Sequence, residues 1–547
     1  MVLTKNRVAG FVRAEGRKLV NGDGEELILR GVGLGSWFLP EGYMWKFPEQ
    51  GDRPRRIERM IEELVGPEKA AQFWETYYDR YTAESDIRQI AKEGFNSIRI
   101  PINARAFIED GEPVRFKANN VHRLDLVIDW CRQYNVYAIL DLHGAPGGQT
   151  GANIDDSEND QPELFTNETY RRMTIELWRQ LADRYKDEWI VAGYDLLNEP
   201  LPDWNAALNP QLMPLYKDIV KAIREVDRMH MIILEGAHWS TDWSIFDEMF
   251  DDNIQLQFHK YWNNPDTESI QKYIDGREQW NAPIFMGEGG ENNIDWYSGA
   301  FCLFEDHDIS WNFWTWKKMD TINSPCSVNR PAGWDRLTAY LTGGERPSAA
   351  EAEQILWEYL DNIALEKCTY HPEVVNALFR RAPVRIPAIF YGYQGEETGY
   401  HIGTKAAKNV GFRVNDGTDI RFIDSEREVA NFQHNGGRPW NMDQRLYVQL
   451  AAGDWLAYDF TSGNSGSGDI GTSSYVVEVR VRVTDEQVGK GALTVSVDGR
   501  SIGAVQAEES EWTTVKLEEA AVLEAGHHRI VIEAAGGPVQ VEWINIT

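Results

Sequence analysis

Short apolar runs alternate with longer amphipathic segments along the first two thirds of the chain. The apolar runs lie at 26–34, 95–100, 136–142, 191–197, 231–236, 254–258, 283–288 and 309–316. Segments between them, such as VHRLDLVIDWCRQYN and YRRMTIELWRQLADRYKDEW, place apolar residues three and four positions apart, which predicts amphipathic helices. Because several runs are apolar on both faces, the pattern predicts a parallel sheet closed into a (β/α)₈ barrel. A doubly wound open sheet is the alternative, but no GxGxxG follows the first strand.

The pattern changes after residue 383. Short alternating segments such as DWLAYDF, SYVVEVRVRV, HRIVIEA and VQVEWINI predict an antiparallel β-sandwich. Between the two regions, EKCTYHPEVVNALFRRAPVRIP has a helical pattern ended by prolines. The sequence therefore predicts a barrel domain at 1–366, a linker at 367–383 and a β-sandwich domain at 384–547.

Composition excludes several functional classes. Of 547 residues, 86 are acidic and 55 basic, a net charge of −31, so nucleic acid and anionic membranes are not expected partners. No stretch approaches the roughly 20 apolar residues that span a bilayer. The four cysteines have no CxxC spacing, which excludes a sulfur-rich zinc site. The first residues lack the apolar core of a signal peptide, which predicts a cytoplasmic protein, or a secreted one if the chain has been trimmed.

Polar residues follow almost every strand of the predicted barrel. In this fold the active site lies at the carboxyl ends of the strands. The residues at those ends, in chain order, are Arg99, Asp141, His143, Asn198, Glu199, Glu235, His259, Tyr261, Glu288 and Trp316. Seven strands contribute to one rim, which predicts a catalytic site there. Glu235, with Asn103 and Glu291, is interpreted as a rim or supporting group.

Glu199 and Glu288 follow the fourth and seventh predicted strands, whose tips face each other across the barrel mouth. Two facing carboxylates can hydrolyse a glycosidic bond, one as the acid and the other as the nucleophile. A metal site is the rival interpretation, but HxH and HExxH motifs are absent, and His143 and His259 would be isolated ligands. The pattern favours a glycosidase without a metal or cofactor.

With these residues at its predicted strand ends, the chain resembles glycoside hydrolase family 5, a retaining (β/α)₈ family. The resemblance rests on GFNSIRIP, AILDLHGAPGGQTG, YDLLNEP, QFHKYW, FMGEGG and WTWK, in the family's order, between about residues 27 and 320. It implies Glu199 as acid/base and Glu288 as nucleophile, with Arg99 and Tyr261 hydrogen-bonded to the nucleophile. The other implied site residues are Asn198 and His143 as ligands of sugar hydroxyls, His259 beside the acid/base, and Trp316 as the floor under the attacked sugar.

Within that family, DLHGAPGGQTG and WTWK are more similar to exo-acting β-1,3-glucanases and β-glucosidases than to cellulases. Those enzymes bind the terminal sugar with a glutamate four residues after a tryptophan, matched here by Trp37 and Glu41, and with a loop aspartate, matched by Asp155 or Asp156. Loops at 35–60 and 144–168 could wall off one end of the site. The expected substrate is a β-glucoside or β-glucan oligosaccharide. An endo-β-glucanase and a non-catalytic carbohydrate-binding protein are the alternatives, and the oligomeric state stays open.

The C-terminal region resembles family 6 carbohydrate-binding modules and related sandwiches. The resemblance rests on RIPAIFYGYQGE, GDWLAYDF and GGPVQVEWINI. Tyr391 and Tyr393 stand where such modules carry calcium-binding glutamates, and Gln540 stands where they carry a sugar-binding asparagine. A working module and a sandwich that only packs on the barrel are both open.

Overall fold

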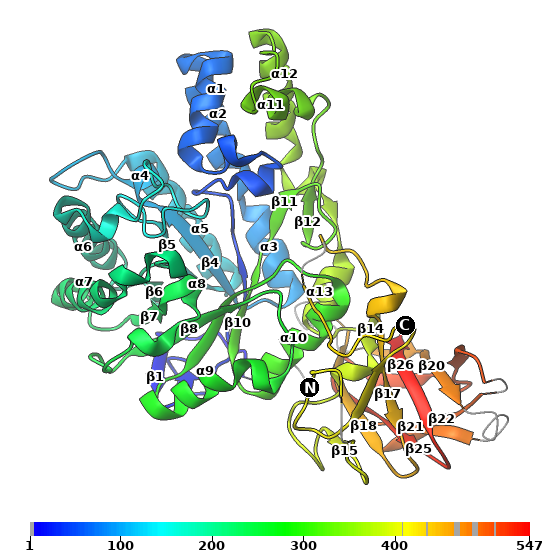
Figure 1. Ribbon diagram of the computed structural model, residues 1–547. Coiled ribbons are helices and arrows are strands. Elements are labelled where there is room, and N and C mark those ends of the chain that lie inside the picture. Colours follow the sequence, from blue (N-terminus) through cyan, green and yellow to red (C-terminus); the bar gives the residue numbers. More distant parts are fainter. Residues whose placement is uncertain (1–4, 407–408, 434–435, 464–470, 484–490, 508–509) are drawn as a thin grey trace.

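The computed structural model describes residues 5–406, 409–433, 436–463, 471–483, 491–507 and 510–547. The eight predicted runs form parallel strands that close in the order β10-β3-β4-β5-β6-β7-β8-β9, which confirms the barrel (Figure 1). The strands are β3 (Arg30–Gly33), β4 (Ser97–Asn103), β5 (Tyr137–Gly144), β6 (Val191–Asp195), β7 (Met231–Glu235), β8 (Ile254–Lys260), β9 (Ile284–Gly290) and β10 (Ser310–Trp314).

Helices cover the outside of the barrel because each buries an apolar face against the strands. These helices are α3 (Glu84–Glu93), α5 (Ala118–Tyr134), α6 (Glu168–Tyr185), α7 (Leu212–Val226), α9 (Thr267–Trp280) and α10 (Ile294–Asp306). The connection from β7 to β8 is different, since it holds the short α8 (Ala237–Ser240) and η5 (Trp243–Ile245) in place of a long helix. A hairpin of β1 (Arg13–Glu15) and β2 (Lys18–Val20) precedes the barrel.

Two insertions stand together beyond the carboxyl ends of β3 and β10 (Figure 1). The first holds η1 (Gly42–Trp45), η2 (Glu49–Gly51), α1 (Pro54–Val65) and α2 (Pro67–Tyr81), and the second holds β11 (Lys317–Met319), β12 (Cys326–Val328), α11 (Trp334–Leu341) and α12 (Ala349–Asn362). Trp334 joins them, since its ring stacks on Phe47 and its Nε1 donates to the Trp45 carbonyl at 2.8 Å. Aromatic packing therefore makes the two insertions one wall beside the barrel mouth.

The segment predicted as a linker is folded and packed. It contains β13 (Thr369–Tyr370) and α13 (Pro372–Leu378), whose Val374 and Val375 are buried. Helix α13 packs against α10, and Arg380 Nε donates to the Ser298 carbonyl at 2.6 Å. The C-terminal region therefore continues from the barrel through buried contacts.

The C-terminal region consists of antiparallel sheets, as predicted. One sheet has the order β16-β17-β26-β20-β23, with β14 also paired to β26, another has β15-β18-β25-β21-β22, and β19 (Thr472–Tyr475) pairs with β24 (Ala521–Glu524). Their bounds are β14 (Val384–Pro387), β15 (Tyr400–His401), β16 (Asp419–Phe422), β17 (Leu446–Leu450), β18 (Trp455–Ser462), β20 (Val477–Val483), β21 (Gly491–Val497), β22 (Arg500–Gln506), β23 (Thr513–Lys516), β25 (Gly526–Ala534) and β26 (Val539–Ile546). Across the described part of the chain, the helices are too short or too polar to span a membrane.

Tyr391 and Tyr393, which were compared above with calcium-binding glutamates, enclose a cation that the chain itself supplies. The Arg413 guanidinium carbon lies 3.4 Å from the ring centroid of Tyr391 and 4.2 Å from that of Tyr393. Arg413 also pairs with Asp416 at 2.6 Å. Gln540 accepts a hydrogen bond from Arg482 Nε at 2.6 Å. These side chains stabilise the sandwich, and the resemblance to a carbohydrate-binding module stays a prediction.

Candidate active site

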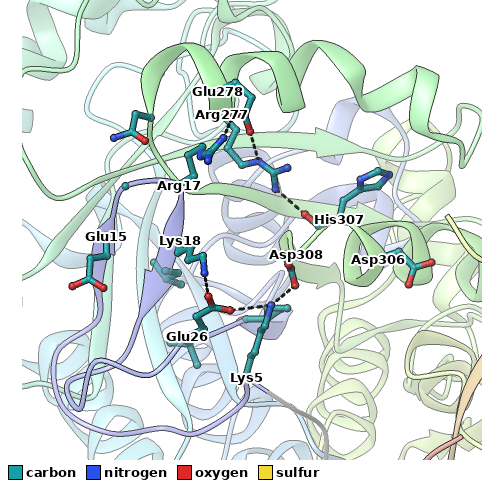
Figure 2. A pocket seen from close by; sticks show the side chains of 15 residues that line it. Lys5, Glu15, Arg17, Lys18, Glu26, Arg277, Glu278, Asp306, His307 and Asp308 are labelled. Carbon is teal, nitrogen blue, oxygen red and sulfur yellow. Dashed lines mark hydrogen bonds and ion pairs between the residues drawn. The ribbon is translucent and has the colours of Figure 1, made fainter. Parts of the chain in front are cut away.

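The two ends of the barrel differ in chemistry. Near the β1–β2 hairpin, a pocket of about 580 Å³ is lined by charges that pair with one another (Figure 2). Lys5 lies between Asp308 and Glu26, at 2.6 and 3.0 Å, and Lys18 also pairs with Glu26. At the opposite end, the polar residues predicted from the strand tips converge in a buried cluster. The candidate active site is therefore at the carboxyl ends of the strands.

Glu199 and Glu288 lie close together in this cluster. One carboxylate oxygen of each, together with a ring nitrogen of His259, falls within a group whose members are all within 4.8 Å of one another. Glu288 accepts hydrogen bonds from Arg99 Nη1 and from the Tyr261 hydroxyl, the latter at 2.7 Å. This closest approach of two carboxylate oxygens is compatible with the roughly 5–5.5 Å between carboxyl groups in retaining glycosidases.

Arg99 connects the strands beneath the two glutamates. Its buried guanidinium pairs with Asp195 at 2.8 Å, Glu235 at 3.1 Å and Asp141 at 3.2 Å. Its Nη2 also donates to Asn198 Oδ1 at 2.8 Å. A planar fork with five donors suits such a hub, because it fixes several carboxylates at once.

Glu235 holds the backbone of Glu199, the predicted acid/base, in place, which agrees with the prediction of a rim or supporting group. Glu199 has φ +43°, a left-handed conformation that is strained for glutamate, and its backbone N–H donates to Glu235 Oε2 at 2.8 Å. The Glu199 side chain accepts from His259 Nδ1 at 2.6 Å. His259 Nε2 lies 3.5 Å from Glu235. Glu235 is therefore a buried positioning residue.

The two histidines of the site have opposite protonation behaviour. Burial disfavours the charged form of His259, but Glu235, Glu288 and Glu199 surround it and raise its pKa well above the ordinary value. Burial lowers the pKa of His143 to about 4. His143 Nδ1 faces Asp141 at 2.7 Å, so the neutral ring donates there and keeps Nε2 as an acceptor. His259 is thus a cation beside Glu199, and His143 offers a lone pair to a hydroxyl.

Opposing influences act on the pKa of Glu288, the candidate nucleophile. Burial raises the pKa of Glu288 above its ordinary value, and the neighbouring Glu199 acts in the same direction. The cations of His259 and Arg99 oppose this rise. The donors around Glu288 therefore support the ionised form that a nucleophile needs.

The prediction that Trp316 floors the sugar site is wrong. Trp316 is 2% exposed and donates from Nε1 to Asp86 of α3 at 2.9 Å, so its ring lies in the packing layer outside the barrel. Trp314, two residues earlier, stacks on His143 with centroids 5.3 Å apart and an angle of 7°. A Cβ at Gly33 would lie 2.6 Å from the Trp314 ring, so glycine makes room for this ring. Trp314 is therefore the tryptophan of WTWK that lies against the site residues.

Glu41 lies in the site and Trp37 does not. Glu41 is buried, its Oε1 has no hydrogen-bond partner among the described residues, and that oxygen lies 3.9 Å from His143 Nε2. Burial raises the pKa of Glu41 well above its usual range, and Glu288 and Glu291 add to this effect. Trp37 stacks on Phe38 and donates from Nε1 to the Tyr78 carbonyl at 2.9 Å. Trp37 is a core residue, which corrects its predicted place in the site.

The predicted sugar ligands Asp155 and Asp156 are structural. Asp155 accepts from Thr150 N and Oγ1 at 2.7 and 2.8 Å, from Gly151 N at 3.1 Å and from Ser157 N at 2.9 Å. Asp156 accepts from Arg105 Nε at 2.5 Å and from Asn103 Nδ2 at 3.0 Å. The other oxygen of Asp156 accepts from Arg55 N at 3.0 Å, so every oxygen of the two aspartates already has a protein donor, and both residues order the loop after β5.

Several site residues were missed at the sequence level. Tyr43 accepts from Trp314 Nε1 at 2.9 Å, and Gln257 donates to Glu235 and, at 3.1 Å, to Asp195. Gln257 and Asp195 could have been found from strand alternation. In IQLQFHK every second residue is polar, and YDLLNEP places an aspartate in an otherwise apolar strand. Inward-facing polar residues of a barrel strand need partners, and these pair with Arg99 and its carboxylates.

The possible ligand atoms of the site are better suited to proton transfer than to metal binding. Among the described residues, the trios Asp141–His143–Glu288 and Glu199–His259–Glu288 bring potential ligand atoms within 4.8 Å of one another. A histidine ligand must be neutral with a lone pair toward the ion. The ring of His259 is a cation between carboxylates, and His143 directs its proton at Asp141.

Comparisons with known proteins agree with this geometry. The model of the family described as cellulase, glycosyl hydrolase family 5, matches residues 63–320. This stretch of the chain belongs to glycosyl hydrolase family 5. It includes β4 to β10 and both glutamates, so the family's barrel and the predicted catalytic pair coincide.

Relatives with different names each match less than half of this chain. A β-xylosidase of Phanerodontia chrysosporium is 33% identical over 43% of this chain and 48% of its own length. A probable glucan 1,3-β-glucosidase A of Emericella nidulans is 31% identical over 48% of this chain and 66% of its own. Endoglucanase C of Acetivibrio thermocellus is 25% identical over 45% and 88%. The chain thus spans about half the length of the first of these relatives.

Proposed function

We propose that this protein is a retaining β-glycosidase that removes terminal β-linked glucose from oligosaccharides or small glucosides. The observation that carries the proposal is the pair Glu199 and Glu288, with carboxylate oxygens within 4.8 Å and separate supports. A dead barrel would not need both carboxylates together with the donors that aim them.

The geometry supports a double displacement. In the first step, a Glu288 oxygen bonds to the anomeric carbon while the bond to the leaving oxygen breaks, and protonated Glu199 gives its proton to that oxygen. In the second step, ionised Glu199 takes a proton from water, the water oxygen bonds to the anomeric carbon, and the ester bond to Glu288 breaks. Arg99 and Tyr261 receive the returning negative charge on Glu288.

Exo action is supported by Glu41 and by the wall beside it. A buried carboxylate oxygen without a protein partner suits a hydroxyl of a terminal sugar, because charge-assisted bonds to hydroxyls are strong in such a setting. The insertions after β3 and β10 stand on the same side. The name of the Emericella relative agrees with exo action on glucans, whereas the endoglucanase relative keeps endo cleavage as the second candidate.

The test combines stereochemistry, products and matched variants. We expect an aryl β-glucoside to release β-glucose first, seen by proton NMR, and laminarin-type or cellulose-type oligomers to yield glucose alone. Glu288→Gln should lose nearly all activity, and Glu199→Gln should retain activity on substrates with good leaving groups and respond to azide. Glu278→Gln, at the other end of the barrel, is the control. α-Glucose as the first product, or reversed roles of the glutamates, refutes the mechanism, and a ladder of oligomers establishes endo action. An aryl β-xyloside in the panel tests the sugar preference.

A further inference from the structure

Two tryptophans stand at the rim beside the acid/base residue. Trp204 lies in η4 (Asp203–Gln211), five residues after Glu199, and its side chain is 68% exposed. Trp239 lies in α8, four residues after Glu235, and is half-buried. Their ring centroids are 5.6 Å apart at 67°. An indole exposed to this extent leaves most of its apolar surface in water, so the fold does not need it for packing.

The backbone that carries Trp239 is held in an unusual conformation. His238, Trp239 and Ser240 have φ of +51°, +57° and +64°, in the left-handed region that non-glycine residues avoid. Hydrogen bonds between Ala237 and Asp242, and from Ser240 Oγ to the Gln257 carbonyl at 3.0 Å, keep the turn in place. Consecutive strained residues held by their surroundings are typical of functional sites.

The same turn is tied to the acid/base segment. The His238 N–H donates to the Leu201 carbonyl at 2.9 Å, and Leu201 follows Glu199 by two residues. The Glu199 N–H is in turn held by Glu235, the last residue of β7. The turn that carries Trp239 is therefore tied to the backbone next to Glu199, the residue proposed to protonate the leaving oxygen.

Strand order places this pair opposite the closed end of the site. Glu41, Tyr43 and Trp314 come from the β3 and β10 side of the ring, and Trp204 and Trp239 follow β6 and β7. In the closed order β10-β3-β4-β5-β6-β7-β8-β9, the neighbours β6 and β7 lie across the barrel from β10 and β3. A substrate whose terminal sugar sits beside Glu41 thus extends its leaving group past Glu199 toward the two tryptophans.

We propose that Trp204 and Trp239 form the binding platform for the leaving group, either the next sugar ring of an oligosaccharide or an aryl aglycone. This inference rests on the proposed function. Flat indole faces bind the C–H faces of sugars and aromatic rings without directional hydrogen bonds. Such a platform accepts leaving groups of different linkage and shape, while the polar closed end fixes the sugar that is attacked.

The test compares leaving groups with and without a ring. β-Glucosyl fluoride has no ring on the leaving side, and a β-linked glucose disaccharide has one. In Trp204→Ala and in Trp239→Ala, the ratio of kcat/KM for the disaccharide to that for the fluoride should fall about 5- to 10-fold, the effect of one lost stacked ring. Trp204→Phe should restore most of it. A ratio is independent of the fraction of folded enzyme, so reduced stability alone cannot produce this result.

A second readout and a matched control complete the experiment. With glucosyl fluoride as donor, transfer of glucose to an added aryl glucoside should fall relative to hydrolysis in the same variants, because the acceptor occupies the platform. Trp189→Ala, which removes a half-buried indole before the amino end of β6, should keep both ratios. Unchanged ratios in both platform variants overturn the inference and leave the proposed function intact. A wild type that cleaves neither substrate overturns both.

Discussion

Replacing Glu41 with glutamine should stabilise the protein and weaken the enzyme. Glu41 is 2% exposed, and its Oε1 has no partner among the described residues. Burial raises its pKa, and Glu288, Glu291, Glu199 and Asp141 add to the effect. Glu41→Gln has nearly the same shape without the charge, so the free energy of unfolding should rise by about 1–2 kcal/mol at pH 7, the scale of removing repulsion between like charges several ångströms apart in a partly buried site.

The pH dependence distinguishes this cause from a general packing effect. A carboxyl whose pKa is raised in the folded state binds its proton more tightly there than in the unfolded chain, whose ordinary value is about 4.3. Its contribution to stability is fully present below that value and is lost as the pH rises toward the folded pKa. The advantage of Glu41→Gln should therefore be small at pH 4 and grow as the pH increases to 8. Urea unfolding at both pH values measures it.

Activity should move in the opposite direction. Loss of a charged acceptor in a buried pocket should lower kcat/KM for glucosides by about 10-fold in Glu41→Gln and about 100-fold in Glu41→Ala, because bonds to an ionised group are stronger than bonds to an amide. Glu291→Gln is the control, since Glu291 pairs with Lys318 at 2.9 Å and its loss should reduce stability. A Glu41→Gln protein that is less stable at pH 7, or whose advantage does not change with pH, refutes the reasoning.

Two further predictions concern the tryptophans of β10 and the histidine beside the acid. Trp316→Ala should cost about 3–5 kcal/mol of stability with kcat/KM of the folded enzyme largely kept, whereas Trp314→Ala should lower kcat/KM at least 10-fold; thermal melts and aryl β-glucoside kinetics check this. Glu235→Gln should lower the pKa of His259, since Glu235 is the largest influence that raises it, and the alkaline limb of the kcat/KM profile should shift to lower pH.

The barrel could be predicted from the sequence because its strands are buried on both faces and its helices on one. Buried runs of this kind are bounded by polar turns, so their number and order can be read without tertiary information. The wall beside the mouth could not be predicted in this way. Residues 35–60 have little periodicity before Pro54, and their fold depends on Trp45 and Phe47 packing against Trp334, nearly 300 residues away.

The proximity of Glu199 and Glu288 could be predicted for a similar reason, and the tryptophan that stacks on His143 could not. Strand ends converge in every barrel of this kind, so Glu199 and Glu288 had to meet. Trp314 and Trp316 are two positions apart in WTWK, so the alternation of side chains along a strand predicts the same face for both. The strand ends at Trp314, and Trp316 turns outward to Asp86. Asp155 likewise looked available only because sequence does not show the four donors around it.

The excess of negative charge in the site connects its stability to its chemistry. Two cations, Arg99 and His259, face the carboxyl groups of Asp141, Asp195, Glu199, Glu235 and Glu288, and Glu41 lies near three of these carboxylates. Burial, together with the neighbouring carboxylates, raises the pKa of Glu41, of Asp195 and of Asp141, the last to about 8. An oxocarbenium-like transition state brings positive charge into this environment. The arrangement that costs stability in the free protein therefore stabilises the transition state more than the neutral substrate, which is the condition for catalysis.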